Sequence, residues 1–139
     1  MMDIFYVLCE CNLEPLRELV ASIEPKNTII IIKEPTVCMT MIPAEDSVEA
    51  QPFYLGEALT TACEVTVDGS MGYGICLGDE PVRAYCIAVI DAITQKPASE
   101  WQEIHHFLEK QLQLIEAAKK VEYNQILQTR VDFKIMEQE

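Results

Sequence analysis

Six cysteines and two adjacent histidines are the residues of this chain whose chemistry could serve metal binding. Cys9 and Cys11 are separated by one residue, which is not the Cys-x-x-Cys spacing of zinc and redox sites, and no second pair completes them. His105 and His106 are neighbours, and on a helix neighbouring side chains point about 100° apart. We therefore expect no metal site in this chain.

Four glycines lie along a predicted hairpin, at Gly69, Gly72, Gly74 and Gly78. A phosphate-binding loop places its glycines between a strand and the start of a helix, and neither a Walker A motif nor a dinucleotide fingerprint is present. We expect these glycines to permit a turn and a close approach of backbone or aromatic groups across the sheet. No bound cofactor is predicted for this chain.

Nucleophilic and acid-base catalysis finds little support in residue spacing. Arg83 and Asp91 lie eight residues apart on a predicted helix and form its polar face, so a solvated or interface ion-pair role is favoured over catalysis. No catalytic residue is predicted. The alternative is a thiol-dependent enzyme that uses Cys63, Cys76 or Cys86, which selective alkylation at neutral pH would reveal.

The charge of the chain limits its partners. Lys and Arg number 10 against 23 Asp and Glu, a formal net charge of -13, which repels nucleic acid and anionic lipid surfaces. The N-terminus has no basic region before its short apolar run, and the cysteines fit apolar core positions as free thiols. These features favour a cytoplasmic protein that binds neither nucleic acid nor membrane.

Hydrophobic periodicity divides the chain into helices and strands. Residues 3–11 and 13–23 are predicted as two short helices, with Asn12 as an N-cap. Residues 28–33 and 37–42 are predicted as two adjacent strands separated by Glu34 and Pro35, and residues 43–51 as an exposed loop. A helix over residues 81–94 is apolar nearly all round, which predicts burial on most sides.

A hairpin is predicted from residues 58–67 and 71–77 around Asp68 and Gly69. A two-residue loop would set Glu64 opposite Tyr73 and face apolar residues with glycines. A three-residue loop instead collects the apolar residues of both strands on one face. Since a one-residue slip inverts every side chain, we favour the three-residue loop.

The C-terminal third is predicted to hold a long helix and a tail. Ser99 and Gln102 form a capping box, and no breaker interrupts residues 98–128. Residues 129–136 alternate charged and apolar side chains, which fits a return strand on the chain's own sheet or a strand added to a neighbour. We predict a single α+β domain over 1–139, with an antiparallel sheet of about four to five strands packed with helices, a long C-terminal helix and an extended tail.

Two stretches resemble the PhnG family, the G subunit of the bacterial carbon-phosphorus lyase core complex. One runs from Phe53-Tyr54-Leu55-Gly56-Glu57-Ala58-Leu59 through Val67-Asp68-Gly69-Ser70-Met71-Gly72-Tyr73-Gly74 to Ile90-Asp91-Ala92, and the other is Thr129-Arg130-Val131-Asp132-Phe133 with Met136. The resemblance covers the chain from about residue 29 onward. The chain departs from the family at Ala62, where Arg is usual, and in the less basic segment 78–85, so it resembles a divergent member.

The resemblance implies an accessory subunit in phosphonate catabolism. The family's complex transfers an alkylphosphonate to the ribose of MgATP with release of adenine, so MgATP would be used by the complex and not bound by this chain. The expected partners are other carbon-phosphorus lyase subunits, especially the I-type subunit, and a stand-alone homodimer is the alternative. The residues expected to bind partners are Arg130, Val131, Asp132, Phe133, Tyr73, Arg83 and Asp91.

Overall fold

The computed structural model describes the backbone of residues 3–45 and 52–137, and the side chains of residues 3–41 and 56–129. Two helices, α1 (Ile4–Glu10) and α2 (Leu13–Ile23), precede a short 3-10 turn, η1 (Glu24–Lys26). The strands β1 (Ile29–Glu45), β2 (Pro52–Val67) and β3 (Ser70–Leu77) follow. Helix α3 (Pro81–Thr94), a second 3-10 turn, η2 (Ala98–Glu100), and α4 (Gln102–Glu137) complete the chain.

The described part of the chain forms one antiparallel sheet of three strands in the order β1-β2-β3. The α+β class is confirmed, but four to five strands were too many. One reason is that the two strands predicted over 28–42 are a single strand. Pairing is irregular between Lys33 and Thr36, around Pro35, which has no N–H to donate, and β1 continues beyond this bulge.

Strand pairing also replaces part of the loop predicted at residues 43–51. Pro43 pairs with Tyr54, Ala44 with Phe53 and Glu45 with Pro52, so β1 and β2 extend to the end of a long hairpin arm. The remainder of the predicted loop, residues 46–51, lies outside the described residues.

The β2–β3 hairpin has a two-residue loop, so the favoured three-residue loop was wrong. Val67 pairs with Ser70, and Asp68 and Gly69 both have positive φ, 50° and 86°, as a type I′ turn requires. Glu64 therefore faces Tyr73. The inward row of β3 consists of Gly72, Gly74 and Cys76, all buried.

Close packing of α3 explains this glycine row. A Cβ added to Gly74 would collide with the carbonyl oxygen of Ala84 and lie 2.6 Å from the amide nitrogen of Ala88. One added to Gly72 would collide with the carbonyl oxygen of Ala88 and lie 2.7 Å from the Cβ of Ala92. The small residues on both elements allow the helix backbone to approach the strand backbone. A close approach was predicted for these glycines, but across the sheet and not from a helix.

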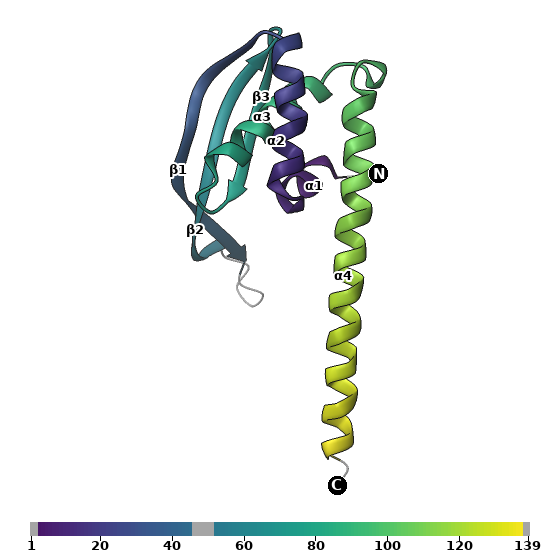
Figure 1. The fold of residues 1–139 in the computed structure, drawn as a ribbon. Coiled ribbons are helices and arrows are strands. Elements are labelled where there is room, and N and C mark those ends of the chain that lie inside the picture. The colour runs from purple at the N-terminus through teal and green to yellow at the C-terminus, as the bar shows by residue number, and fades with distance from the viewer. Residues whose placement is uncertain (1–2, 46–51, 138–139) are drawn as a thin grey trace.

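Helix α3 forms the centre of the molecule. It contacts all three strands on one side and α1 and α2 on the other (Figure 1). The expectation that it is buried on most sides is confirmed by nine buried residues, among them Ile87, Val89 and Ile90. The predicted bounds of α3 agree with the structure, and those of α1 and α2 agree to within a residue or two.

Helix α4 is longer than predicted. Its first turns pack on the body through buried Ile104 and Leu108 and contact α1, while its C-terminal half extends past the other elements (Figure 1). Residues 129–136, predicted as a strand or tail, continue the helix. With 36 residues, the helix is about 54 Å long at the usual rise. The proposed capping box does not form, because 98–100 make the η2 turn and the helix begins at Gln102.

Within the described ranges, no helix is both long enough and apolar enough to cross a membrane.

Candidate partner-binding surface

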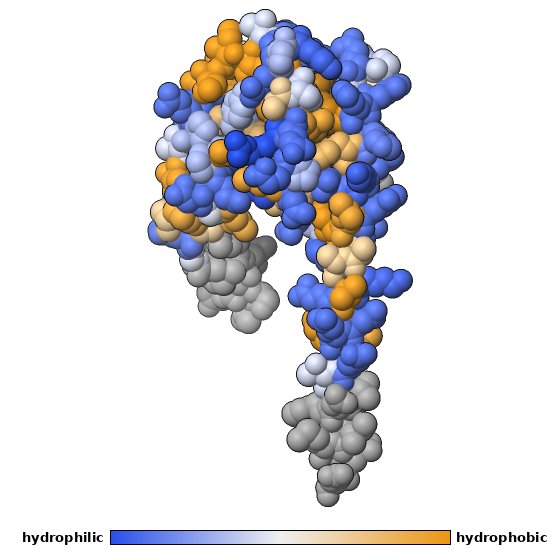
Figure 2. Space-filling model, viewed as in Figure 1, coloured by the Kyte–Doolittle hydropathy of each residue, from blue (hydrophilic) through white to orange (hydrophobic). Residues whose placement is uncertain are grey.

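Beyond its buried residues Ile104, Leu108 and Gln111, helix α4 exposes large apolar side chains on more than one face. We call this part of the helix, from Leu114 onward, the free half of α4. Leu114 and Val121 lie seven residues apart and share one face, and Tyr123 and Leu127 lie four apart on another. Val121 is 58% exposed and Ile126 57% exposed. Figure 2 shows hydrophobic residues interleaved with hydrophilic ones along this projecting segment. Exposed apolar side chains do not stabilise an isolated helix in water. These side chains therefore form a candidate contact surface.

A second apolar area lies on the β1–β2 arm. Val37 pairs with Thr61 and Met39 with Leu59, and Thr61 lies on the face of the sheet that α3 covers. Alternation therefore places Val37, Met39, Met41 and Leu59 on the continuation of that face, where all four are exposed. Helix α3 does not extend far enough to cover the whole arm. The arm thus presents an uncovered continuation of the core.

Arg83 lies inside the molecule. Its side chain is 8% exposed, and Nη1 donates to the carbonyl oxygens of Leu8 at 2.9 Å and Cys11 at 2.8 Å. Its Nε donates to the carboxylate of Glu80 at 3.3 Å. These carbonyls end α1 and have no intrahelical partner, so Arg83 holds α1 against α3.

The structure brings Asp91 and Tyr73 together, although through the backbone of Tyr73. The N–H of Tyr73 donates to Oδ2 of Asp91 at 2.9 Å, which satisfies an edge donor of β3. The Tyr73 side chain is exposed on the outer face of the sheet. Arg83 and Asp91 do not pair with each other in the ion pairs of the described residues. Arg130, Val131, Asp132 and Phe133 lie in the helical backbone, and their side chains are outside the described residues.

The three thiols considered for catalysis are poorly suited to nucleophilic chemistry. Cys63, Cys76 and Cys86 are buried, and burial raises the pKa of the Cys76 and Cys86 thiols to about 11. Burial, reinforced by the charge of Glu64, also raises the pKa of Cys63. Since the thiolate is the reactive species, these shifts oppose a thiol-dependent enzyme.

His105 likewise makes local contacts. His105 Nδ1 lies 3.4 Å from the carboxylate of Glu109, one turn along α4, and its ring stacks at a tilt on Trp101. Among the residues with described side chains, no three His, Cys, Asp or Glu side chains are grouped as metal ligands would be.

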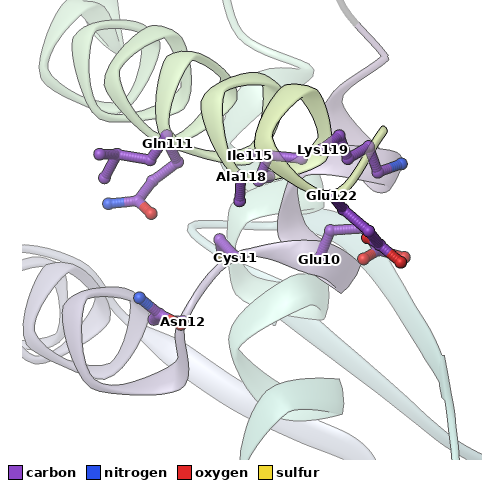
Figure 3. Close-up of a pocket in the computed structure, with 9 residues that line it drawn as sticks. Glu10, Cys11, Asn12, Gln111, Ile115, Ala118, Lys119 and Glu122 are labelled. Carbon is purple, nitrogen blue, oxygen red and sulfur yellow. The ribbon is translucent and has the colours of Figure 1, made fainter. Parts of the chain in front are cut away.

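A cavity of about 270 Å³ lies between the α1–α2 junction and α4 (Figure 3). Sequence reasoning missed it, because its walls come from segments about 100 residues apart. One signal was available: Gln111 is a polar residue among the apolar positions by which α4 packs on the body, and it is buried. The cavity is lined by Glu10, Cys11, Asn12, Gln111, Leu114, Ile115, Ala118, Lys119 and Glu122.

Comparison with known proteins agrees with the resemblance noted in the sequence. Residues 2–138 match the family model described as phosphonate metabolism protein PhnG. A curated relative from Rhizobium meliloti (strain 1021), alpha-D-ribose 1-methylphosphonate 5-triphosphate synthase subunit PhnG, is 27% identical over 116 residues, covering 83% of this chain and 74% of the relative. Because the family model spans nearly the whole chain, this protein belongs to the PhnG family of phosphonate metabolism proteins.

Proposed function

We propose that this chain is an accessory, partner-binding subunit of the complex that transfers an alkylphosphonate to the ribose of MgATP with release of adenine. Family membership and the name of the Rhizobium relative, a subunit of a ribose methylphosphonate triphosphate synthase, support a place in phosphonate metabolism. In this proposal the chain contacts other carbon-phosphorus lyase subunits, above all the I-type subunit, and MgATP binds elsewhere in the complex.

The observation that carries the partner-binding role is the exposed apolar surface on the free half of α4. Val121, Tyr123 and Ile126 are each more than half exposed on α4. The C-terminal half of this helix extends past the body of the molecule (Figure 1). Covering such side chains removes apolar surface from water, which favours assembly. The exposed face of the β1–β2 arm offers a second area for the same purpose.

The residues expected to bind partners divide into two groups in this proposal. Arg130, Val131, Asp132 and Phe133 continue the projecting helix, and Tyr73 is exposed on the sheet, so we assign direct contacts to these five. Arg83 and Asp91 bind groups of their own chain, the end of α1 and the edge of β3. We assign them an indirect role, in which they fix the elements that a partner contacts.

Co-expression tests the proposal. The tagged chain is produced with an untagged I-type subunit from the same organism. The molar mass of the purified material is then measured by light scattering after size-exclusion chromatography. The expected result is a stoichiometric complex that survives gel filtration. Recovery of the tagged chain alone, in the presence of a folded I-type subunit, would contradict the proposal.

Self-association is the alternative that the same exposed surface supports. A stable dimer of the chain alone, unchanged when the I-type subunit is added, would favour a stand-alone homodimeric binding protein. A monomer, or a dimer that dissociates as the I-type subunit is titrated in, would favour the accessory subunit.

A further inference from the structure

We propose that the cavity between the α1–α2 junction and α4 receives one arginine side chain, with its adjoining main chain, from a partner subunit. This inference rests on the proposed function, which it deepens by naming the chemistry of one partner contact. It depends on four features of the cavity, namely its size, its charged end, its amide end and its apolar middle.

The size of the cavity favours a side chain over a free small molecule. Small-molecule sites usually measure about 300–1,000 Å³, whereas this cavity is about 270 Å³ and open to solvent. A nucleotide with its triphosphate exceeds this space, and its negative charge would meet two carboxylates here. A single long side chain fits both the volume and the opening.

One end of the cavity carries two carboxylates from different elements. Glu10, at the end of α1, and Glu122, on α4, direct their carboxylates to the same end (Figure 3). The neighbouring ammonium of Lys119 is engaged by α1, since it donates to the Tyr6 hydroxyl and lies 4.5 Å from the centroid of that ring. Two carboxylates against one ammonium leave a negative end that attracts a cation.

The other end carries two carboxamides, those of Gln111 and Asn12 (Figure 3). Gln111 is only 5% exposed, and its amide has no hydrogen-bond partner among the described side chains and backbone. Fully enclosed polar atoms in the described part are all paired, so this amide opens into the cavity. Because the cavity is open to solvent, this amide is available to a guest. A peptide group, with one donor and one acceptor, matches a carboxamide.

The middle of the cavity is apolar, formed by Ile115 and Ala118 with the neighbouring Leu114. An arginine residue has the same order of parts: a main-chain peptide group, three side-chain methylenes and a planar cationic head. Its guanidinium donates five N–H groups in a fixed fork, which suits two carboxylates from separate elements better than the compact ammonium of lysine does. The strongly acidic chain, with net charge -13, also favours a basic segment as the guest.

A titration with a minimal probe tests the site in the isolated chain. N-acetylarginine amide is added to the ¹⁵N-labelled protein while the side-chain NH₂ signals of Gln111 and Asn12 are followed by NMR. We expect saturable shifts of these signals at millimolar probe, and at least tenfold weaker binding by the Glu10→Gln/Glu122→Gln variant. The control is Glu18→Gln/Glu116→Gln, which removes the same charge from exposed positions that do not line the cavity. Linear shifts spread over the surface, or equal affinity for N-acetyllysine amide, would overturn the assignment to arginine.

The complex provides the second readout and separates this inference from the proposed function. In the assembly with the I-type subunit, the Glu10→Gln/Glu122→Gln variant should lose at least tenfold in affinity relative to the matched control. If the complex forms and the two variants bind equally well, the arginine site is wrong and the accessory-subunit proposal stands. If no complex forms with either, the proposed function fails, and the probe titration still decides the chemistry of the cavity.

Discussion

Arg83 donates a hydrogen bond from Nη1 to the carbonyl oxygen of Cys11 at 2.8 Å, joining the middle of the core to the link between the first two helices. The same nitrogen binds the carbonyl oxygen of Leu8, one turn earlier. Because the last carbonyls of a helix lack intrahelical partners, one buried guanidinium satisfies both and fixes where α1 ends. It thereby also positions Cys11, Asn12 and one wall of the cavity against α4.

Replacing Arg83 by Met should destabilise the fold. The substitution removes the guanidinium donor from the carbonyl oxygens of Leu8 and Cys11, and Leu8 keeps only the weak donor of the Cys11 thiol at 3.6 Å. We therefore expect a loss of about 3 kcal/mol in the free energy of unfolding. Urea unfolding followed by circular dichroism measures it. The matched control is Arg17→Met, which removes an exposed arginine that pairs with Glu14 at 3.8 Å and should cost less than about 0.5 kcal/mol. Equal losses for the two variants would show that Arg83 does not hold α1.

A methyl group on Gly74 should be among the most damaging small changes in the chain. The added Cβ would meet backbone atoms of Ala84 and Ala88, which cannot move without shifting α3 from the sheet. We expect Gly74→Ala to lower the unfolding free energy by about 3 kcal/mol. Gly56→Ala is the control, since a Cβ there has no atom within 4 Å, and its effect should be near zero. A tolerated Gly74→Ala would contradict the packing of α3 on β3.

The same glycines show where sequence reasoning was limited. The predicted hairpin register was wrong because we expected apolar side chains, and not glycines, to face inward on β3. Gly72 and Gly74 face inward because Ala84, Ala88 and Ala92 bring the helix backbone against them, a contact between segments that no pattern within one strand reveals. By contrast, α3 was predicted with its observed bounds, since Pro81 and its continuous apolar run are local signals.

The C-terminal segment shows a different limit. Alternation over residues 129–136 predicted a strand or tail, yet the structure continues α4 through it. A helix that is already formed gains each further residue at low cost, and no Gly or Pro follows Pro97 in the sequence. The absence of a breaker was therefore a better guide than a short alternating pattern. The grouping of Glu10, Gln111 and Glu122 around one cavity could not be predicted from the sequence, because only the packing of α4 on α1 brings these residues together.

The thiols should report on the core through their pH dependence. Burial raises the pKa of Cys76 and Cys86 from an ordinary 9.0 to about 11, so in the folded chain both stay protonated where the unfolded chain ionises. The unfolded state then binds fewer protons, and the free energy of unfolding should fall as pH rises from about 9 to about 11. The fall is on the order of 2 kcal/mol per thiol, and it should shrink in Cys76→Ala/Cys86→Ala.

Labelling with iodoacetamide gives an independent measure of the same thiols. At pH 7.5 the exposed Cys38 should react first, while Cys63, Cys76 and Cys86 should react only as the chain unfolds in urea. Mass spectrometry of the alkylated peptides distinguishes them. Rapid, selective modification of Cys63, Cys76 or Cys86 in the folded protein would reopen the thiol-enzyme alternative.

The free half of α4 should contribute to assembly and hardly at all to folding. Val121 and Ile126 are each more than half exposed, so replacing both by Gln removes little buried contact and should change the unfolding free energy by less than about 0.5 kcal/mol. If a partner covers these side chains, the same variant should lose at least tenfold in affinity for the I-type subunit. Glu116→Gln/Lys120→Gln, which alters the same helix with no change in net charge, should bind normally. Removing residues 129–139 should also lower the affinity for the I-type subunit. If the truncated or the Gln-substituted chain still bound at full affinity, the contact would lie on the β1–β2 arm instead.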